Sequence, residues 1–239
     1  MAEPSPSAGA DQMVVTDRTR LRRMTEEGSH GLADLRAVLD AGFVCHLGIV
    51  VDDWPMVIPT SYGRLGDHLY LHGSVASRSL RTARHAGPAC VTVTHVDGLV
   101  LARSVFEHSI NYRCAMVYGT PEVLSEPDQK LVGLEAISNQ AAPGQWEYVR
   151  SPSTKELAAT TVLRLGLDEA SVKIRQGPPH DGDGPDAELD VWAGEIPLRI
   201  ARMDPVADPT LRTGVALPEH LADGHLAPGS VPVRDLAHR

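Results

Sequence analysis

The segment LHGSVASRSLRTARH, residues 71–85, carries side chains that could bind an anion. An apolar run ends there, and a basic segment with helical character follows. The first turn of a helix has free backbone N–H groups and the positive end of the helix dipole, which favour phosphate. Gly73 lets the backbone approach a ligand, Ser74 and Ser77 add hydroxyl donors, and Arg78 adds a planar guanidinium that can grip two oxygens. The residues predict a phosphate clamp.

A second interpretation of the same segment is structural. The whole chain has a net charge of -9, and Arg81, Arg84 and His85 continue the basic character at helical spacing. A basic surface helix that balances an acidic protein has the same pattern. The spacing alone favours this second interpretation, so the choice depends on the elements around the segment.

Those elements are mostly short strands separated by turns. Val, Ile, Thr and Tyr dominate the runs, as is typical of half-buried strands. The Asp97-Gly98 dipeptide predicts a hairpin turn. The predicted strands are 43–50, 55–63, 68–72, 89–96, 98–103, 112–124, 160–167, 170–175 and one within 191–203. This pattern predicts a mainly β protein, an antiparallel Greek-key-like barrel with peripheral helices.

Three helices are expected around the barrel. The first spans 31–41 with Ser29 as a possible cap, and the second spans 126–140. The third spans 153–159, where Ser153 and Glu156 stand at the positions of a capping box. We expect a disordered arm over 1–20, one barrel domain over 21–205 and a weakly ordered tail over 206–239.

The composition of the 239-residue chain excludes several classes of function. Net negative charge and 4% aromatic residues disfavour nucleic-acid binding. The three cysteines form no CxxC motif, and the histidines form no zinc motif, which predicts no metal site and a reducing, cytoplasmic location. No apolar run approaches about 18 residues, so no membrane span is expected.

Four pieces in order resemble the FMN-binding split-barrel superfamily. They are VIPTSYG (57–63), LYLHGSVASRSL (69–80), ACVTVT (89–94) and NYRCAMVYG (111–119). The chain is similar to the pyridoxamine 5'-phosphate oxidase-like branch that includes nitroimidazole-resistance-type flavoproteins. The resemblance covers about residues 20–175. It implies an FMN cofactor and a cytoplasmic homodimer with its sites at the subunit interface.

The resemblance also implies a set of residues around the flavin. The first strand would run beside the ring, and the end of the next strand would meet the ribityl chain and phosphate. A later strand would come from the second subunit or the opposite barrel wall. The implied residues are Ile58, Pro59, Thr60, Ser61, Leu71, His72, Gly73, Ser74, Ser77, Arg78, Arg113 and Cys114.

His72 is the candidate for a catalytic group near the reacting edge of the flavin. The implied reaction is two-electron transfer through FMN to or from a small organic molecule. Three alternatives stay open: a haem-binding member with His72 or His46 as axial ligand, a deazaflavin-dependent reductase, and a flavin-binding protein without turnover. Arg113 could pair with a ligand anion or with a carboxylate. Trp192 and Arg199 match the oxidases' vitamin-binding segment only thinly, so pyridoxamine phosphate is not the expected substrate.

Overall fold

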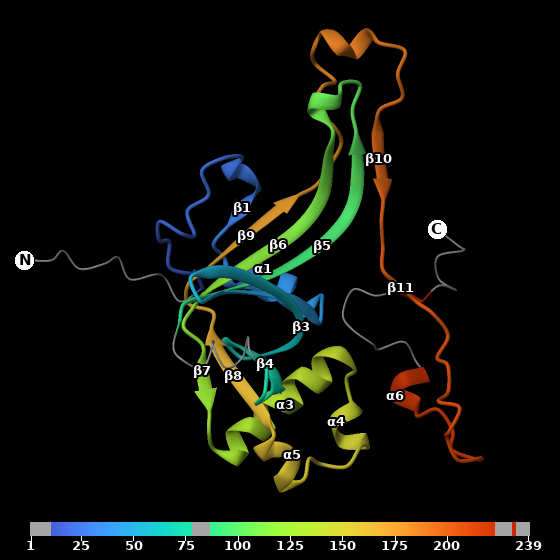
Figure 1. The fold of residues 1–239 in the computed structure, drawn as a ribbon. Coiled ribbons are helices and arrows are strands. Elements are labelled where there is room, and N and C mark those ends of the chain that lie inside the picture. The colour runs from blue at the N-terminus through green and yellow to red at the C-terminus, as the bar shows by residue number, and fades with distance from the viewer. Residues whose placement is uncertain (1–10, 78–86, 223–230, 233–239) are drawn as a thin grey trace, which may run out of the picture.

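A strongly curved antiparallel sheet forms the body of the protein in the computed structural model, which describes residues 11–77, 87–222 and 231–232 (Figure 1). Neighbouring strands follow the order β1-β9-β6-β5-β2-β3-β4-β8-β7, and β10 adds to β5. The strands are β1 (Gly28–Ser29), β2 (Val44–Val51), β3 (Trp54–Leu65), β4 (His68–Ser74), β5 (Ala89–Leu101), β6 (Ser109–Gly119), β7 (Glu122–Leu124), β8 (Thr160–Gly166), β9 (Ala170–Arg175), β10 (Gly194–Pro197), β11 (Ala201–Arg202) and β12 (Val231–Pro232). The prediction of a mainly β, antiparallel barrel is confirmed.

Helices lie at the periphery of this sheet, as the sequence predicts. The α-helices are α1 (Leu32–Asp40), α3 (Pro127–Ala141), α4 (Gln145–Tyr148), α5 (Thr154–Ala158) and α6 (Glu219–Ala222), and the 3-10 turns are η1 (Thr25–Glu27), η2 (Val105–Glu107) and η3 (Pro185–Glu188). The capping box of α5 is confirmed: Ser153 Oγ accepts from the backbone N–H of Glu156, and the Glu156 side chain accepts from Ser153 N. The cap of α1 differs, because Gly31 is the N-cap and Ser29 Oγ instead accepts from Gly31 N.

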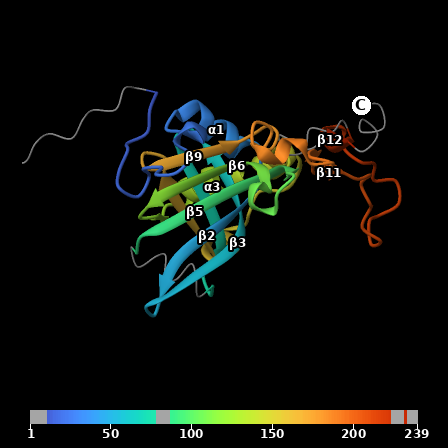
Figure 2. The same ribbon diagram turned by 90° about the horizontal axis from the view of Figure 1, so that it is seen from above.

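The core lies on the inner face of the barrel and follows from strict alternation along the strands. The row of cross-strand neighbours Leu47, Val91, Val117 and Ala170 is fully buried. Because successive side chains of a strand point to opposite faces, the residues between these point outward. We call the outward side of β3, β2, β5 and β6 the outer face. Figure 2 shows these strands side by side.

Helix α3 covers the outward side of the sheet at β3, β4 and β8. Two glycines make this approach possible. A Cβ added to Gly63 would lie 2.3 Å from the backbone carbon of Ala136, and one added to Gly133 would lie 2.7 Å from Val162 Cγ1. The helix therefore packs backbone against backbone over β3 and ends before it reaches the exposed part of the outer face.

The predicted hairpin at Asp97-Gly98 is wrong. Strand β5 continues through this dipeptide with a bulge between Val96 and Gly98. Both carboxylate oxygens of Asp97 are bound by Arg113, and its carbonyl accepts from Leu198 N at 2.9 Å. These contacts hold the extra residue out of the ladder, so the chain bends instead of turning. The turn lies further on, at η2, so β5 and β6 extend far beyond the barrel (Figure 1).

Other boundaries differ in detail. The predicted strand 112–124 is two strands, β6 and β7, separated at Thr120-Pro121, because proline cannot donate to a ladder.

Residues 11–20 pack against the barrel: Met13 is 3% exposed, and Arg18 binds Glu169. Within the described residues, none of the helices combines the length and apolar character needed to cross a membrane.

Candidate functional site

The sheet opens between β3 and β4. Their ladder runs from Leu65 paired with His68 to Tyr62 paired with Leu71. Beyond that last pair, the next two positions are Ser61 on β3 and His72 on β4, where the strands separate. Residues Trp54–Ser61 pair with β2 on one edge, and the described residues supply no ladder partner for the other edge. This edge therefore offers backbone N–H and C=O groups to a ligand.

The end of β4 forms one border of this opening. Leu71 points into the core and is 1% exposed, whereas His72 points outward and Ser74 is exposed. A turn follows, in which Ser74 Oγ accepts from Ala76 N at 3.2 Å and the Ser74 carbonyl accepts from Ser77 N at 2.9 Å. The predicted clamp residue Arg78 and the basic residues after it lie outside the described residues.

His72 has a buried nitrogen that satisfies no hydrogen bond. It lies opposite Val162 of β8, which is fully buried, and its Nδ1 has no partner among the described residues. Burial lowers the pKa of His72, so the neutral imidazole is favoured near pH 7. A neutral imidazole beside an opening can accept a hydrogen bond or bind a metal ion. The side chain fits an axial ligand of haem as well as a contact to a flavin.

The four predicted residues of β3 divide between two faces. Ile58 pairs with Leu47, and Thr60 pairs with Cys45, so both point toward the core. Pro59 and Ser61 alternate with them and share the outer face with His72. A flat ligand in the opening would therefore meet the side chains of Pro59 and Ser61, and only the backbone of Ile58 and Thr60.

Arg113 and Cys114 lie elsewhere on the sheet. Strands β5 and β2 stand between β6 and β3, so one chain does not bring these two residues to the β3–β4 opening. They also point to opposite faces of β6. Arg113 binds Asp97, while Cys114 accepts a 3.4 Å hydrogen bond from Thr94 on the outer face. A second copy of the chain could bring its own β6 to the opening.

Two hollows border these elements. One hollow, of about 280 Å³, adjoins the outer face, and its side chains are apolar except for the thiol of Cys90 and the phenol of Tyr118. It is lined by Gly48, Ile49, Val50, Pro55, Met56, Val57, Pro88, Ala89, Cys90 and Tyr118. A larger one of about 500 Å³ lies between α3 and β3. Its main polar groups already bind each other, since Arg64 pairs with Asp40, and Gln140 donates to two carbonyls. The smaller hollow is the better extension of the site.

Sequence reasoning missed two features of this region. The open edge of β3 follows from where two ladders end, which no local motif reveals. Thr161, opposite Gly73 on β8, has a buried hydroxyl with no partner in the described part of the chain and is 2% exposed. It lies on the inner face, the reverse side from His72. No sequence signal distinguishes it from other strand threonines.

Comparisons with other proteins agree with this architecture. Residues 32–174 match the family model described as pyridoxamine 5'-phosphate oxidase. The flavocytochrome Anf3 from Azotobacter vinelandii has 36% sequence identity and a TM-score of 0.83, covering 89% of this chain and 98% of its own. A protein from Mycobacterium smegmatis described as binding FAD and heme has 36% identity and a TM-score of 0.79, covering 84% and 98%.

A more distant structure shares the fold. It is described as a putative 5-nitroimidazole antibiotic resistance protein from Bacteroides thetaiotaomicron, has 20% identity and a TM-score of 0.53, and covers 62% of this chain and 86% of its own. No curated protein matches the chain. The family model spans more than half of the 239 residues, and two relatives exceed 30% identity over most of the chain. The chain therefore belongs to the pyridoxamine 5'-phosphate oxidase family and has its split-barrel fold.

Proposed function

We propose that this protein is a homodimeric redox protein that binds a flavin and a haem. The observation that carries the proposal is half-buried His72, which borders the open edge of β3 and whose Nδ1 is buried without a partner among the described residues. The two relatives with 36% identity support it, because one is described as a flavocytochrome and the other as binding FAD and heme. The FMN expectation is thereby widened to a flavin with a haem beside it.

The flavin would lie along the open edge of β3. Backbone groups of Ile58 to Ser61 would bind its ring, as the edge strand is free to do. The turn from Gly73 to Ser77 would meet its ribityl phosphate, and Arg78 would grip two phosphate oxygens. FMN and FAD both contain the flavin ring, the ribityl chain and its phosphate, so the same residues could bind either cofactor. FMN alone is the simpler ligand, and FAD would extend beyond it.

The haem would be held by His72 as its axial ligand. A bound flavin can exchange electrons in pairs or one at a time, and a haem iron exchanges one, so the two together could connect a two-electron donor or acceptor to a one-electron partner. The lowered pKa of His72 keeps its imidazole neutral and available. We further infer that the organic substrate is small and that the free cysteines Cys45, Cys90 and Cys114 reflect a reducing cytoplasm.

The second subunit would complete the site. Cys114 lies on the outer face of β6, four strands along the sheet from His72, so it can approach a flavin only on a partner. Arg113 would take part only by exchanging Asp97 for a ligand anion. These two roles follow from the predicted homodimer, with the outer face as its interface.

An absorption spectrum of the protein as purified, freed of unbound haem and flavin by gel filtration, tests the proposal. We expect flavin bands near ~375 and ~450 nm and a Soret band near ~410 nm. In His72→Ala the Soret band should disappear, while the flavin bands remain. His180→Ala is the control, because His180 is exposed in the loop after β9, next to Asp181, which binds Arg103 near the β5–β6 turn, and should leave both sets unchanged.

The two other results point elsewhere. Loss of the flavin bands in His72→Ala, with no Soret band in the wild type, would assign His72 to the flavin, and the haem would be abandoned. A Soret band that survives in His72→Ala would remove His72 as the ligand. Chromatography of the flavin released by heat then distinguishes FMN from FAD.

A further inference from the structure

The C-terminal arm, residues 189–222, leaves the barrel after a short pairing. Strand β10 pairs with the far half of β5, from Gly194 with Leu101 to Pro197 with Gly98. After Leu198 the chain departs from this sheet and runs down one side of the molecule to α6 (Figure 1). Figure 2 shows the same segment extending away from the body.

The arm exposes more large apolar side chains than any other described segment of its length. Val206 is 93% exposed, Ile200 is 73% and Met203 is 70%. The exposed set is Leu189, Val191, Trp192, Ile196, Leu198, Ile200, Met203, Val206, Leu211, Val215 and Leu217. Single exposed apolar residues are ordinary, but a contiguous series of them marks an interaction surface.

Contacts with the rest of its own chain hold the arm at two ends. At one end is the β10–β5 pairing. At the other, His220 lies 2.9 Å from Gln145 Oε1 and its ring lies 5.3 Å from that of Tyr148. Between these ends, Ile200, Met203 and Val206 remain exposed. The arm is thus anchored at both ends; β11 in its middle pairs with β12, and the described residues leave its apolar side chains exposed.

The match to the flavocytochrome extends into this arm. The match to the flavocytochrome covers 89% of the 239 residues, about 213, whereas the family domain ends at residue 174. Even if every residue up to 174 is matched, about 39 later residues must be matched too. The match to the nitroimidazole-type structure covers only 62%. The match to the flavocytochrome therefore includes residues beyond the family domain.

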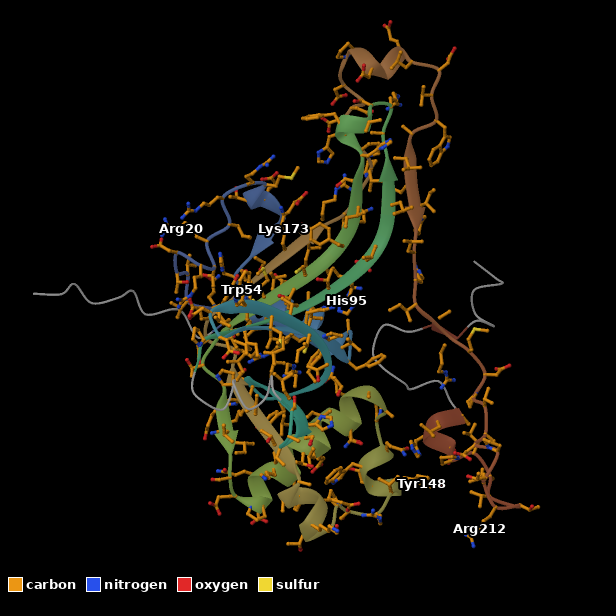
Figure 3. The ribbon with its side chains drawn as sticks, in the orientation of Figure 1. Arg20, Trp54, His95, Tyr148, Lys173 and Arg212 are labelled. Carbon is orange, nitrogen blue, oxygen red and sulfur yellow. The ribbon has the colours of Figure 1, made fainter. Side chains whose placement is uncertain are left out.

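A second exposed apolar surface lies on β2 and β3. It consists of Val44, Val50 and Val57, which point outward and of which Val57 is 65% exposed; Trp54, which pairs with Val51 at the end of the same two strands, is 76% exposed. This surface adjoins the opening beside His72. Figure 3 shows Trp54 on the barrel well apart from Arg212 in the arm of the same chain. Each chain therefore carries two apolar surfaces that its described residues leave uncovered.

We propose that the arm of each protomer packs across β2 and β3 of its partner and covers the partner's cofactor site. The inference rests on the homodimer of the proposed function and adds the segment that closes it. Burial of the arm's apolar middle against Val50 and Val57 would remove apolar area of both surfaces from water. It would also shield a ligand at the β3 edge from solvent.

Cross-linking in mixed dimers tests this placement directly. A photoreactive benzoylphenylalanine replaces Met203 in a heavy-isotope chain, which is mixed with an unlabelled wild-type chain, and peptides are analysed by mass spectrometry after irradiation. We expect cross-links from the heavy arm to light peptides within residues 43–57. Cross-links confined to one chain, or to another part of the partner, would overturn the proposal. The control position is Phe106 at the hairpin tip, 90% exposed, which should give no link to 43–57.

A substitution series provides the second measurement. The triple variant Ile200→Ser, Met203→Ser, Val206→Ser changes only side chains that are exposed in the protomer, so folding should persist. We expect the dimer dissociation constant, measured by sedimentation velocity without cofactor, to rise at least tenfold, and bound flavin to dissociate at least tenfold faster. The control is Val105→Ser, Phe106→Ser. An unchanged dimer would overturn the arm's role, whereas absence of any bound flavin in wild type would instead refute the proposed function.

Discussion

Arg113 and Asp97 form a two-pronged ion pair with N–O distances of 2.8 Å at the bulge of β5. The carbonyl of Asp97 also accepts a hydrogen bond from the backbone N–H of Leu198, which directly follows β10 in the C-terminal arm. One residue thereby connects a strand of the barrel, the neighbouring strand and the arm. The ion pair is partly exposed, with about a third of each side chain accessible.

The first prediction concerns this pair. Asp97→Ala should lower the free energy of unfolding by about 1 kcal/mol, since partly exposed ion pairs contribute little more than this. Arg113→Ala should lower the free energy of unfolding by a similar amount. The double variant should lower it little more than either single variant, because the two residues act as a unit. Urea denaturation measures all three. Costs that simply add in the double variant would show that the two residues act independently and that Arg113 serves another partner.

The second prediction concerns the contact between α3 and β3. Gly63→Ala should destabilise the protein by about 3 kcal/mol, because the new methyl group would overlap the backbone of Ala136. Gly182→Ala is the control: no heavy atom lies within 4 Å of its added Cβ, so the change should stay within about 0.5 kcal/mol. Thermal denaturation compares them. Equal melting temperatures for the two variants would refute the close packing of α3.

The third prediction concerns acid stability. Hydrogen bonds from Arg18 and Thr16 lower the pKa of Glu169, which joins residues 11–20 to the barrel. A carboxyl with a lowered folded pKa stabilises the protein above its unfolded pKa, and this contribution is lost as pH falls through the folded value. Glu169→Gln should therefore cost about 1 kcal/mol or less at pH 7, and the gap to wild type should close toward pH 3.

Urea titrations at pH 7, 5 and 3.5 measure this gap. Glu26→Gln serves as the control, because Glu26 is exposed and forms no ion pair with the described residues. A gap for Glu169→Gln that stays constant with pH would mean that charge pairing with Arg18 is not its cause.

The fourth prediction concerns the phosphate clamp, which rests on the sequence. Arg78→Ala should weaken flavin binding by about 1.5–3 kcal/mol, the range for hydrogen bonds to a charged group. Arg84→Ala, six residues further along the sequence, should change affinity much less. Fluorescence titration with FMN measures both. Similar losses in the two variants would indicate a general effect of positive charge instead of a clamp.

The strands could be predicted because alternation of apolar side chains is a local signal. Residues 44–51 alternate between exposed and buried positions with few exceptions, and the predicted strand there is nearly the observed one. The bulge at Asp97 could not be predicted, because the residue that holds it, Arg113, is distant in sequence. A local Asp-Gly signal was overridden by a tertiary contact.

The candidate site shows the same division. His72 could be selected from its type and its place at a strand end. Its Nδ1, however, is buried with no partner among the described residues, and its neighbour across the ladder is Val162, ninety residues later in the chain. The opening beside Ser61 depends on where β4 leaves β3. Alternation then decides which β3 side chains face a ligand. These side chains can be predicted from the sequence once the direction of one β3 residue is known.

The two strands that close the barrel come late in the chain, and this sets an order in time. Strand β8 completes the edge of β4, and β9 completes the edge of β6, so both early strands are synthesised well before their neighbours. Because a ribosome delivers the N-terminal part first, β4 and β6 wait with unpaired backbone until residues 160–175 emerge. The arm, residues 189–222, which would pack on a partner, is synthesised after β9. A nascent chain is thus most exposed to mispairing just before β8 appears, and the proposed dimer would assemble after the barrel is complete.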